Sequence, residues 1–240
     1  MIRCSSLGKI MPDAKSIDPA LMTDEAKSIH AKKKRTDEEQ SVLDALLMKT
    51  LSVGAKTYLK GLARQVVYGY RPELRTKYTD KGLIVEDRCI ELYNSVMLSD
   101  AVKNTERRSN GWLTGECDFL LPHKGVDIKA SWSLETFPVL SEDCHDSDYE
   151  WQMRGYMILF DRQEWEVAFC MESTPPELIR FEQEDLHIVD HIPENLRVTT
   201  ITYQRDAEKE ARIETKCNAA MEYLAETIKR IKREHQEDES

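Results

Sequence analysis

Residues 115–131 read GECDFLLPHKGVDIKAS, and this stretch decides the fold of the chain. The turn-forming residues 122–125 separate two runs with the composition of β-strands, which predicts a hairpin. On the second strand, Asp127 and Lys129 are two residues apart, so their side chains point to the same face. Asp118 lies on the partner strand, and antiparallel pairing across a short turn can bring it within a few ångströms of Asp127.

Two neighbouring carboxylates can share a hard divalent cation such as Mg²⁺ or Mn²⁺. Such a site can bind metal through oxygen, activate water and neutralise the charge that develops on a phosphodiester during hydrolysis. A lysine beside two carboxylates stays charged, so we expect Lys129 to position water and stabilise charge rather than act as a free-amine base. Glu86, on a helix that precedes the hairpin, is a candidate additional ligand or water holder.

The alternative reading of the D-x-K pattern is a solvated charge pair on an edge strand, because the pattern often occurs by chance. The apolar neighbours Val126 and Ile128 favour a strand with one face in the core and the other in a cleft. Charged residues opposite an apolar face can still be plain surface.

Outward from the hairpin, the chain alternates between helical and strand patterns. Spacing is helical at 37–68, with a break expected at Gly54, and at 81–98, 149–160 and 206–233, and it is strand-like at 112–121, 125–132, 164–172 and 197–204. This order predicts an α/β (α+β) fold, in which a central mixed β-sheet is flanked by helices and long helices occur towards both termini.

The formal net charge of −10 over 240 residues counts, by itself, against a partner as negative as DNA. The charge is unevenly distributed, however. Acids dominate residues 142–150 and the end EHQEDES, whereas bases gather in KKKR at 32–35, between 64 and 81, and at 107–108. A local basic surface is therefore compatible with the acidic total.

The six scattered cysteines form no CxxC pair, which argues against a structural zinc or an iron–sulfur cluster. We expect them to stay reduced. No apolar run approaches the ~20 residues of a transmembrane helix. The start MIRCSSLGKIM lacks the profile of a signal peptide, so we expect a soluble, cytoplasmic protein.

Residues 115–131 resemble the PD-(D/E)XK motif of RecB-like nucleases, in which an aspartate on one strand is followed by D/E-x-K on the next. Residues 149–156, YEWQMRGY, resemble the glutamine-bearing helix of that group, with Gln152 as the glutamine. Residues 2–10, IRCSSLGKI, are similar to the I-T-A-S-x-(apolar) segment of the lambda exonuclease and YqaJ-type viral recombinases, and Gly82 with Glu86 resembles their G-x-x-x-E helix. The likeness covers residues 1 to about 172, although no motif aligns between positions 11 and 81.

The resemblance implies a restriction-endonuclease-like core and an active site with divided roles. Mg²⁺ or Mn²⁺ would be held by Asp118, Asp127 and the backbone carbonyl of Ile128, while Lys129 and Gln152 manage the water and Glu86 assists. The residues that the resemblance assigns to DNA contacts are Arg3, Ser5, Tyr149, Arg154 and Tyr156.

Three positions depart from the family pattern. The family's arginine before the amino-terminal serine is absent, so Arg3 or another base has to replace it as the 5′-phosphate anchor. Asp127 is one methylene shorter than the more usual glutamate, and Arg154 replaces a second glutamine. Ordinary interpretations also exist: Gln152 as a polar residue on a half-buried helix, Ser5 and Ser6 as a helix N-cap, and Tyr156 as a core residue.

By resemblance, the expected activity is 5′-to-3′ digestion of one strand of duplex DNA by a ring of three subunits, feeding a single-strand annealing protein in phage-type recombination. We expect one nuclease domain over 1–240, made of a helical N-terminal region (1–80), a catalytic core (81–205), and a C-terminal helix with an acidic tail (206–240). One alternative is a RecB-like enzyme that cuts flaps, single strands or internal sites. Another is a catalytically inactive DNA-binding or inhibitor protein that keeps the fold.

Overall fold

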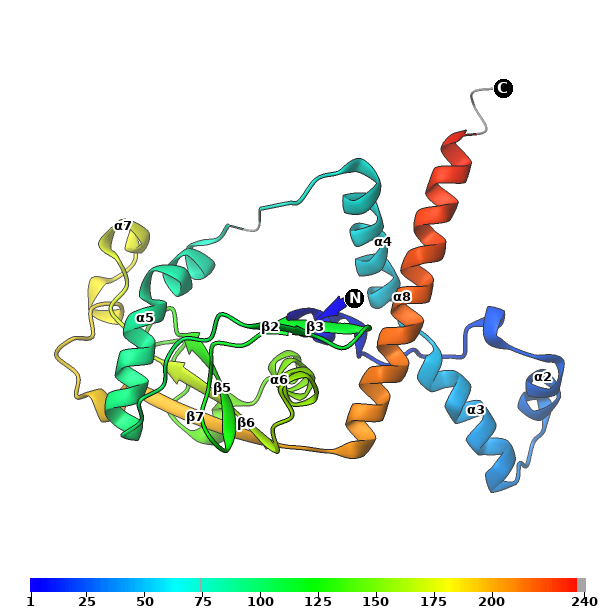
Figure 1. The fold of residues 1–240 in the computed structure, drawn as a ribbon, viewed down its shortest axis with the longest axis horizontal. Coiled ribbons are helices and arrows are strands. Elements are labelled where there is room, and N and C mark those ends of the chain that lie inside the picture. The colour runs from blue at the N-terminus through cyan, green and yellow to red at the C-terminus, as the bar shows by residue number, and fades with distance from the viewer. Residues whose placement is uncertain (74, 237–240) are drawn as a thin grey trace. The chain divides into compact units, whose positions relative to one another are not determined.

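The predicted hairpin forms the edge of a four-stranded sheet in the computed structural model (Figure 1). Strand β4 (Phe119–Leu120) pairs antiparallel with β5 (Lys124–Ala130). Strand β5 runs parallel to β6 (Glu164–Cys170), and β6 runs antiparallel to β7 (Val198–Gln204). The sheet order is therefore β4-β5-β6-β7 with both kinds of pairing, which confirms the predicted mixed sheet.

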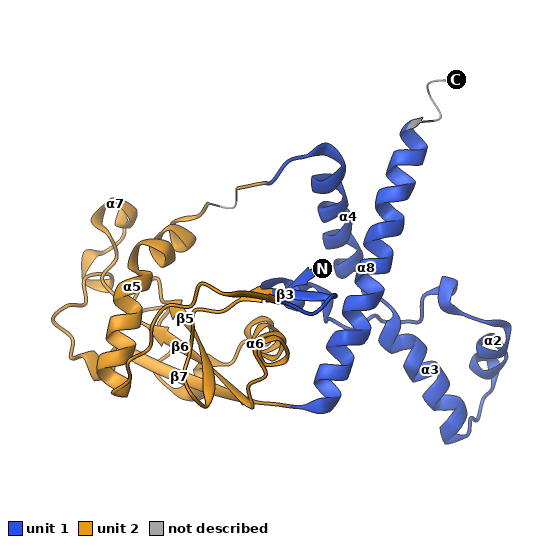
Figure 2. Ribbon diagram, viewed as in Figure 1, with its two compact units in different colours: residues 1–71, 109–114, 206–240 blue, residues 72–108, 115–205 orange. Residues whose placement is uncertain are grey.

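The structure describes residues 1–73 and 75–236. Contacts divide the chain into two units, shown in different colours in Figure 2 and described separately below. The first unit comprises residues 1–71, 109–114 and 206–240, and the second comprises 72–108 and 115–205. Residues 237–240 of the predicted acidic tail lie outside the described residues.

The second unit holds the four-stranded sheet and the helices that cover it. These helices are α5 (Lys77–Met97), α6 (Ser147–Phe160), α7 (Pro176–Ile179) and the short 3₁₀ helices η3 (Ser141–Cys144), η4 (Glu184–Leu186) and η5 (Glu194–Leu196). Val126 of β5 packs with Tyr93 of α5 in the core. Trp165 of β6 lies against Tyr156 of α6, with ring centroids 5.1 Å apart. Because residues alternate in direction along a strand, α5 and α6 cover opposite faces of the sheet.

One close approach fixes the start of β5. Gly125 is the register partner of Trp165 on the parallel neighbour β6. A Cβ at position 125 would overlap the indole ring of Trp165, so only glycine fits there.

The first unit is mainly helical. Its helices are α1 (Leu7–Ile10), α2 (Asp24–Ala31), α3 (Asp37–Lys49), α4 (Val53–Tyr68), the long α8 (Ala207–Gln236), and the 3₁₀ helices η1 (Cys4–Ser6) and η2 (Pro19–Leu21). Helices α4 and α8 pack against each other, and α2 and α3 share a small core of Ala26, Ile29 and Leu43. The long C-terminal helix predicted at 206–233 is confirmed.

A second sheet contains β1 (Ile2–Arg3), β2 (Arg107–Ser109) and β3 (Leu113–Glu116) in the order β1-β3-β2. The sequence predicted a single strand over 112–121, but the structure divides it into β3 and β4. Cys117 and Asp118 lie between them, and the Asp118 carboxylate accepts the N–H of Ile128 at 2.6 Å.

The helical stretch 37–68 is broken, as predicted, but not at Gly54. Helix α3 ends at Lys49, and α4 begins at Val53 because the Ser52 side chain accepts the N–H of Ala55. Gly54 is therefore inside the first turn of α4. The position of the break is thus set by the capping Ser52 and not by Gly54.

All six cysteines are buried thiols outside any disulfide. Within residues 1–73 and 75–236, no helix combines the length and the apolar character needed to cross a bilayer.

Candidate active site

The candidate site is built on β5 and the residue before β4. The register pairs Phe119 with Val126, and one step further along the same register brings Asp118 opposite Asp127. Asp127 is buried, with only 2% of its surface exposed, and forms an ion pair with Lys129. The strand thus presents an acid and an ammonium group on one face, as the sequence spacing predicted.

Asp118 is held in an environment that disfavours its charge. Burial and repulsion from Asp127 raise the pKa of Asp118 to about 7, although the Lys129 ammonium and the N–H of Ile128 favour the ionised form. A divalent cation bound by both carboxylates would relieve this repulsion.

Lys129 stays protonated in this arrangement. Burial alone would lower its pKa, but the nearby Asp127 carboxylate outweighs burial, and the net pKa lies above the ordinary lysine value. Its Nζ also lies 4.7 Å from the ring centroid of Tyr149, at the start of α6. An ammonium group held this way can orient a water and stabilise negative charge, whereas it is a poor proton acceptor.

Gln152 comes to the same face from α6. Its Nε2 donates to the Tyr156 hydroxyl at 3.0 Å and lies 3.5 Å from Oδ1 of Asp127. The Tyr156 hydroxyl in turn donates to the backbone carbonyl of Glu116 at 2.9 Å. Tyr156 is itself buried, so it orients Gln152 from within the core and does not present a surface for DNA.

Glu86 lies on α5 and is bound by a lysine that the sequence did not single out. Lys103 donates to Glu86 at 2.6 Å and lies 3.9 Å from Asp87. The negative charge of Glu86 contributes to raising the pKa of Asp118, which places Glu86 within electrostatic reach of the site. Helix α5 therefore holds Glu86 near Asp118, and Lys103 is the ion-pair partner of Glu86.

The residues expected to bind DNA lie in different settings. Tyr149 supports Lys129, as described above. Arg154 is buried, bonded to Glu150 at 2.7 Å and to the carbonyl of Gln204 at 2.9 Å, so its guanidinium is engaged within the fold. Arg3 and Ser5 are exposed and belong to the first unit, whereas the acids belong to the second.

The ordinary N-cap reading of the amino-terminal serines is not supported for Ser6. Ser6 precedes α1 but makes no capping hydrogen bond; its hydroxyl accepts from Tyr58 at 2.8 Å. Ser5 lies in η1, immediately before Ser6.

The donor set fits a hard divalent cation. Asp118 and Asp127 supply carboxylate oxygens, and Asp127 Oδ2 is buried with no hydrogen bond other than its ion pair with Lys129 among the described residues. No group of three or more His, Cys, Asp or Glu side chains suited to a metal occurs in residues 1–73 and 75–236. A cation here would therefore need a backbone carbonyl, such as that of Ile128, and water to complete its ligands. Burial raises the pKa of the neighbouring Cys117 thiol to about 12, so it does not compete as a thiolate.

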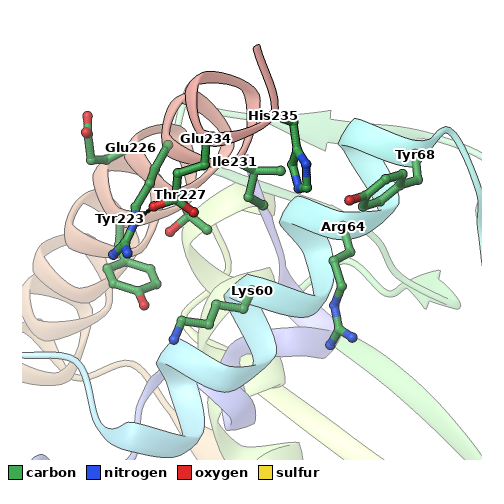
Figure 3. A pocket seen from close by; sticks show the side chains of 10 residues that line it. Lys60, Arg64, Tyr68, Tyr223, Glu226, Thr227, Ile231, Glu234 and His235 are labelled. Carbon is green, nitrogen blue, oxygen red and sulfur yellow. Dashed lines mark hydrogen bonds and ion pairs between the residues drawn. The ribbon is translucent and has the colours of Figure 1, made fainter. Parts of the chain in front are cut away.

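Two cavities lie away from these residues. A cavity of about 550 Å³ opens between α4 and α8 in the first unit (Figure 3), with Lys60 and Arg64 on one wall and Tyr223 and Ile231 on the other. A second cavity of about 520 Å³ in the same unit includes Lys56 and Thr50. Neither cavity is lined by a residue that the sequence assigned to catalysis. The candidate site is therefore identified by the chemistry of Asp118 and Asp127 and not by a large cavity.

Sequence reasoning missed Lys103 and the support given by Tyr156 to Gln152. Lys103 lies in a loop between α5 and β2, where a lone lysine carries no motif. A second unforeseen group is the buried carboxylate of Glu166, which binds Tyr93 at 2.6 Å and Lys124 at 2.8 Å. Lys124 and Lys129 are an odd number of residues apart on β5, so this second lysine–acid pair lies on the opposite face.

No protein-family model matches the chain, and no curated protein matches it. Among solved structures, a phage-related exonuclease from Haemophilus somnus 129PT is 30% identical, with a TM-score of 0.80 and 96% of each chain covered. An alkaline exonuclease (LHK-Exo) from Laribacter hongkongensis is 14% identical, with a TM-score of 0.64 over 98% of this chain and 93% of that one. The same exonuclease in complex with dAMP has a TM-score of 0.59 at 14% identity, with the same coverage. At 14% identity, these last two likenesses show the fold alone.

Proposed function

Because this chain belongs to the lambda-exonuclease-like family of PD-(D/E)XK nucleases, we propose that it is a metal-dependent exonuclease that hydrolyses one strand of duplex DNA from its ends, 5′ to 3′. The observation that carries the proposal is that Asp118, from before β4, and Gln152, from α6, meet Asp127 and Lys129 at one face of β5. A DNA substrate is further supported by the nucleotide dAMP bound to the similarly folded LHK-Exo.

The side chains divide the chemistry among them. Asp118, Asp127 and the carbonyl of Ile128 would hold Mg²⁺ or Mn²⁺, and Glu86 would assist from α5. When bound, such a cation polarises the phosphate and makes water a better nucleophile. Lys129 remains an ammonium and stabilises negative charge on the phosphoryl oxygens. Gln152, oriented by Tyr156, positions the attacking water through its amide.

The remaining expectations belong to the same proposal. Arg3, Ser5 and Tyr149 are the candidate DNA contacts, with Arg3 or another base as the 5′-phosphate anchor. The full chain would act as one nuclease domain in the cytoplasm, within a ring of three subunits. Its single-stranded product would be passed to an annealing protein in phage-type recombination.

A gel assay on end-labelled linear duplex tests the activity directly. We expect stepwise shortening with Mg²⁺ or Mn²⁺, none with EDTA, and none by the Asp118→Ala variant. Covalently closed circular duplex should stay intact, since an exonuclease needs an end. Cutting of closed circles, flaps or single strands would instead identify the RecB-like alternative.

The alternative of an inactive DNA-binding protein is separated by a pair of lysine variants. Lys129→Met should lower turnover by about 10²-fold or more while DNA binding is retained. Lys124→Met is the matched control, because Lys124 lies on the same strand and also pairs with a buried carboxylate, but on the opposite face. If neither variant changes turnover, or wild type has none, the catalytic role is refuted.

A further inference from the structure

Lys81, a lysine of α5, is buried at the point where β5 ends. Lys81 has no exposed surface and is among the largest fully buried side chains of the protein. Its Nζ donates to the backbone carbonyl of Ser131 at 2.6 Å and to that of Trp132 at 3.0 Å. These two residues directly follow β5, and Ser131 is only two positions beyond Lys129.

The end of β5 is held by hydrogen bonds from several elements, including one between His187 Nδ1 and the Trp132 carbonyl at 3.2 Å. The N–H of Ser131 donates to the carbonyl of Cys170, the last residue of β6, at 2.9 Å. The Trp132 carbonyl also accepts the Thr174 hydroxyl at 3.1 Å, in the segment after β6. Lys81 supplies hydrogen bonds from α5 to two backbone carbonyls, and α5 also places Tyr78 against the Trp132 ring, with centroids 5.2 Å apart. Since α5 also carries Glu86, this lysine ties together the two elements that bring Glu86, Asp127 and Lys129 to the site.

An ammonium group at this position is costly to bury. No carboxylate of the described residues forms an ion pair with Lys81, and burial lowers its pKa to about 8. The field of the more distant Glu172 and Cys89 opposes this lowering, and that of Arg88 adds to it. The two carbonyl acceptors are therefore its principal direct stabilisation, which makes the connection between α5 and β5 specific.

We infer that Lys81 is a positioning residue of the nuclease reaction, which fixes the end of β5 against α5 and so sets Lys129 and Asp127 relative to Glu86. This inference rests on the proposed function. Lys81 touches neither substrate nor the reacting atoms. Its loss should therefore act on the geometry of the transition state more than on the affinity for DNA.

The test is Lys81→Met, which keeps the length of the side chain but removes the charge and the donors. We expect kcat on linear duplex to fall about tenfold or more, with KM and the metal-free affinity for DNA within about twofold of wild type. The matched control is Lys216→Met. Lys216 is also fully buried and donates to a backbone carbonyl, that of Thr50 at 2.6 Å, but it lies on α8 in the first unit.

Both variants should lose thermal stability, so stability alone does not decide. A kcat that falls no more in Lys81→Met than in Lys216→Met overturns the inference, as does a rise in KM with kcat unchanged. If Lys81→Met does not fold, Lys81→Leu decides, because it removes the same donors with a shorter apolar side chain; a kcat that is no lower than in Lys216→Leu then overturns the inference. Absence of activity in wild type would refute the proposed function instead.

Discussion

Asp118 is a candidate-site residue whose charge state depends strongly on its surroundings. In the metal-free protein its folded pKa is about 7, whereas the unfolded value is near 3.8. The folded state therefore binds a proton more tightly. Protonated Asp118 therefore contributes to the free energy of unfolding. This contribution is complete below the unfolded pKa and is lost as the pH rises through the folded pKa of about 7.

Asp118→Asn should consequently stabilise the metal-free protein. The gain should grow as the pH rises from about 4 to 7, reach roughly 2 kcal/mol, and stay constant above 7. Denaturant unfolding in EDTA at several pH values measures it. Equal stability of the variant and wild type above pH 7 would contradict the environment described for Asp118.

Tyr156 offers a test of how Gln152 is held. Tyr156→Phe removes the hydroxyl that connects Gln152 to the Glu116 carbonyl, so we expect a loss of about 1 kcal/mol in stability and a several-fold lower kcat. Tyr203→Phe is the control, since its hydroxyl bonds to His145 at 3.2 Å in the same unit. A kcat that is unchanged in both variants would exclude the orienting role.

At the residue scale, the proximity of side chains could be predicted from the sequence where the geometry is local. Asp118, Asp127 and Lys129 come together through one short hairpin, so their spacing in the sequence was enough. Lys103 and Lys81 reach their partners from 17 and 50 positions away, and such pairings depend on how α5 packs on the sheet. No local pattern records that packing.

At the scale of elements, the close contact between β5 and β6 can be tested by one substitution. Gly125→Ala would force a methyl group into the Trp165 ring, so we expect a destabilisation of about 1–3 kcal/mol. Gly61→Ala is the control: it lies inside α4 with open space around it, and alanine there should stabilise by about 0.5–1 kcal/mol. Chemical denaturation of both variants provides the comparison, and a neutral Gly125→Ala would show that the indole can move aside.

Element types followed from periodicity, whereas element ends did not. The long helix α8 and the strands β6 and β7 agree with the predicted patterns. The break at Ser52 and the interruption at Asp118 were misplaced or missed, because each depends on one side chain that binds a particular backbone N–H. Capping bonds of this kind outweigh the general tendency of glycine to end a helix.

At the scale of the whole molecule, the acidic net charge has to be reconciled with the proposed DNA substrate. Contacts with phosphates release counterions, so the affinity of the metal-free protein for duplex should fall steeply as salt increases, in spite of the net charge of −10. Fluorescence anisotropy with labelled duplex at several salt concentrations measures this dependence. Binding that is insensitive to salt would argue that phosphate contacts do not drive it.

The division of the chain also limits how it can be taken apart. The backbone passes between the two units four times, at residues 71–72, 108–109, 114–115 and 205–206, so neither unit is one continuous segment. A shortened gene that encodes only 72–205 would still include Leu113 and Thr114 but would delete Ile2 and Arg3, their strand partners. Trimming the protein to a minimal catalytic fragment thus exposes an unpaired strand edge, and a single protease cut releases neither half intact.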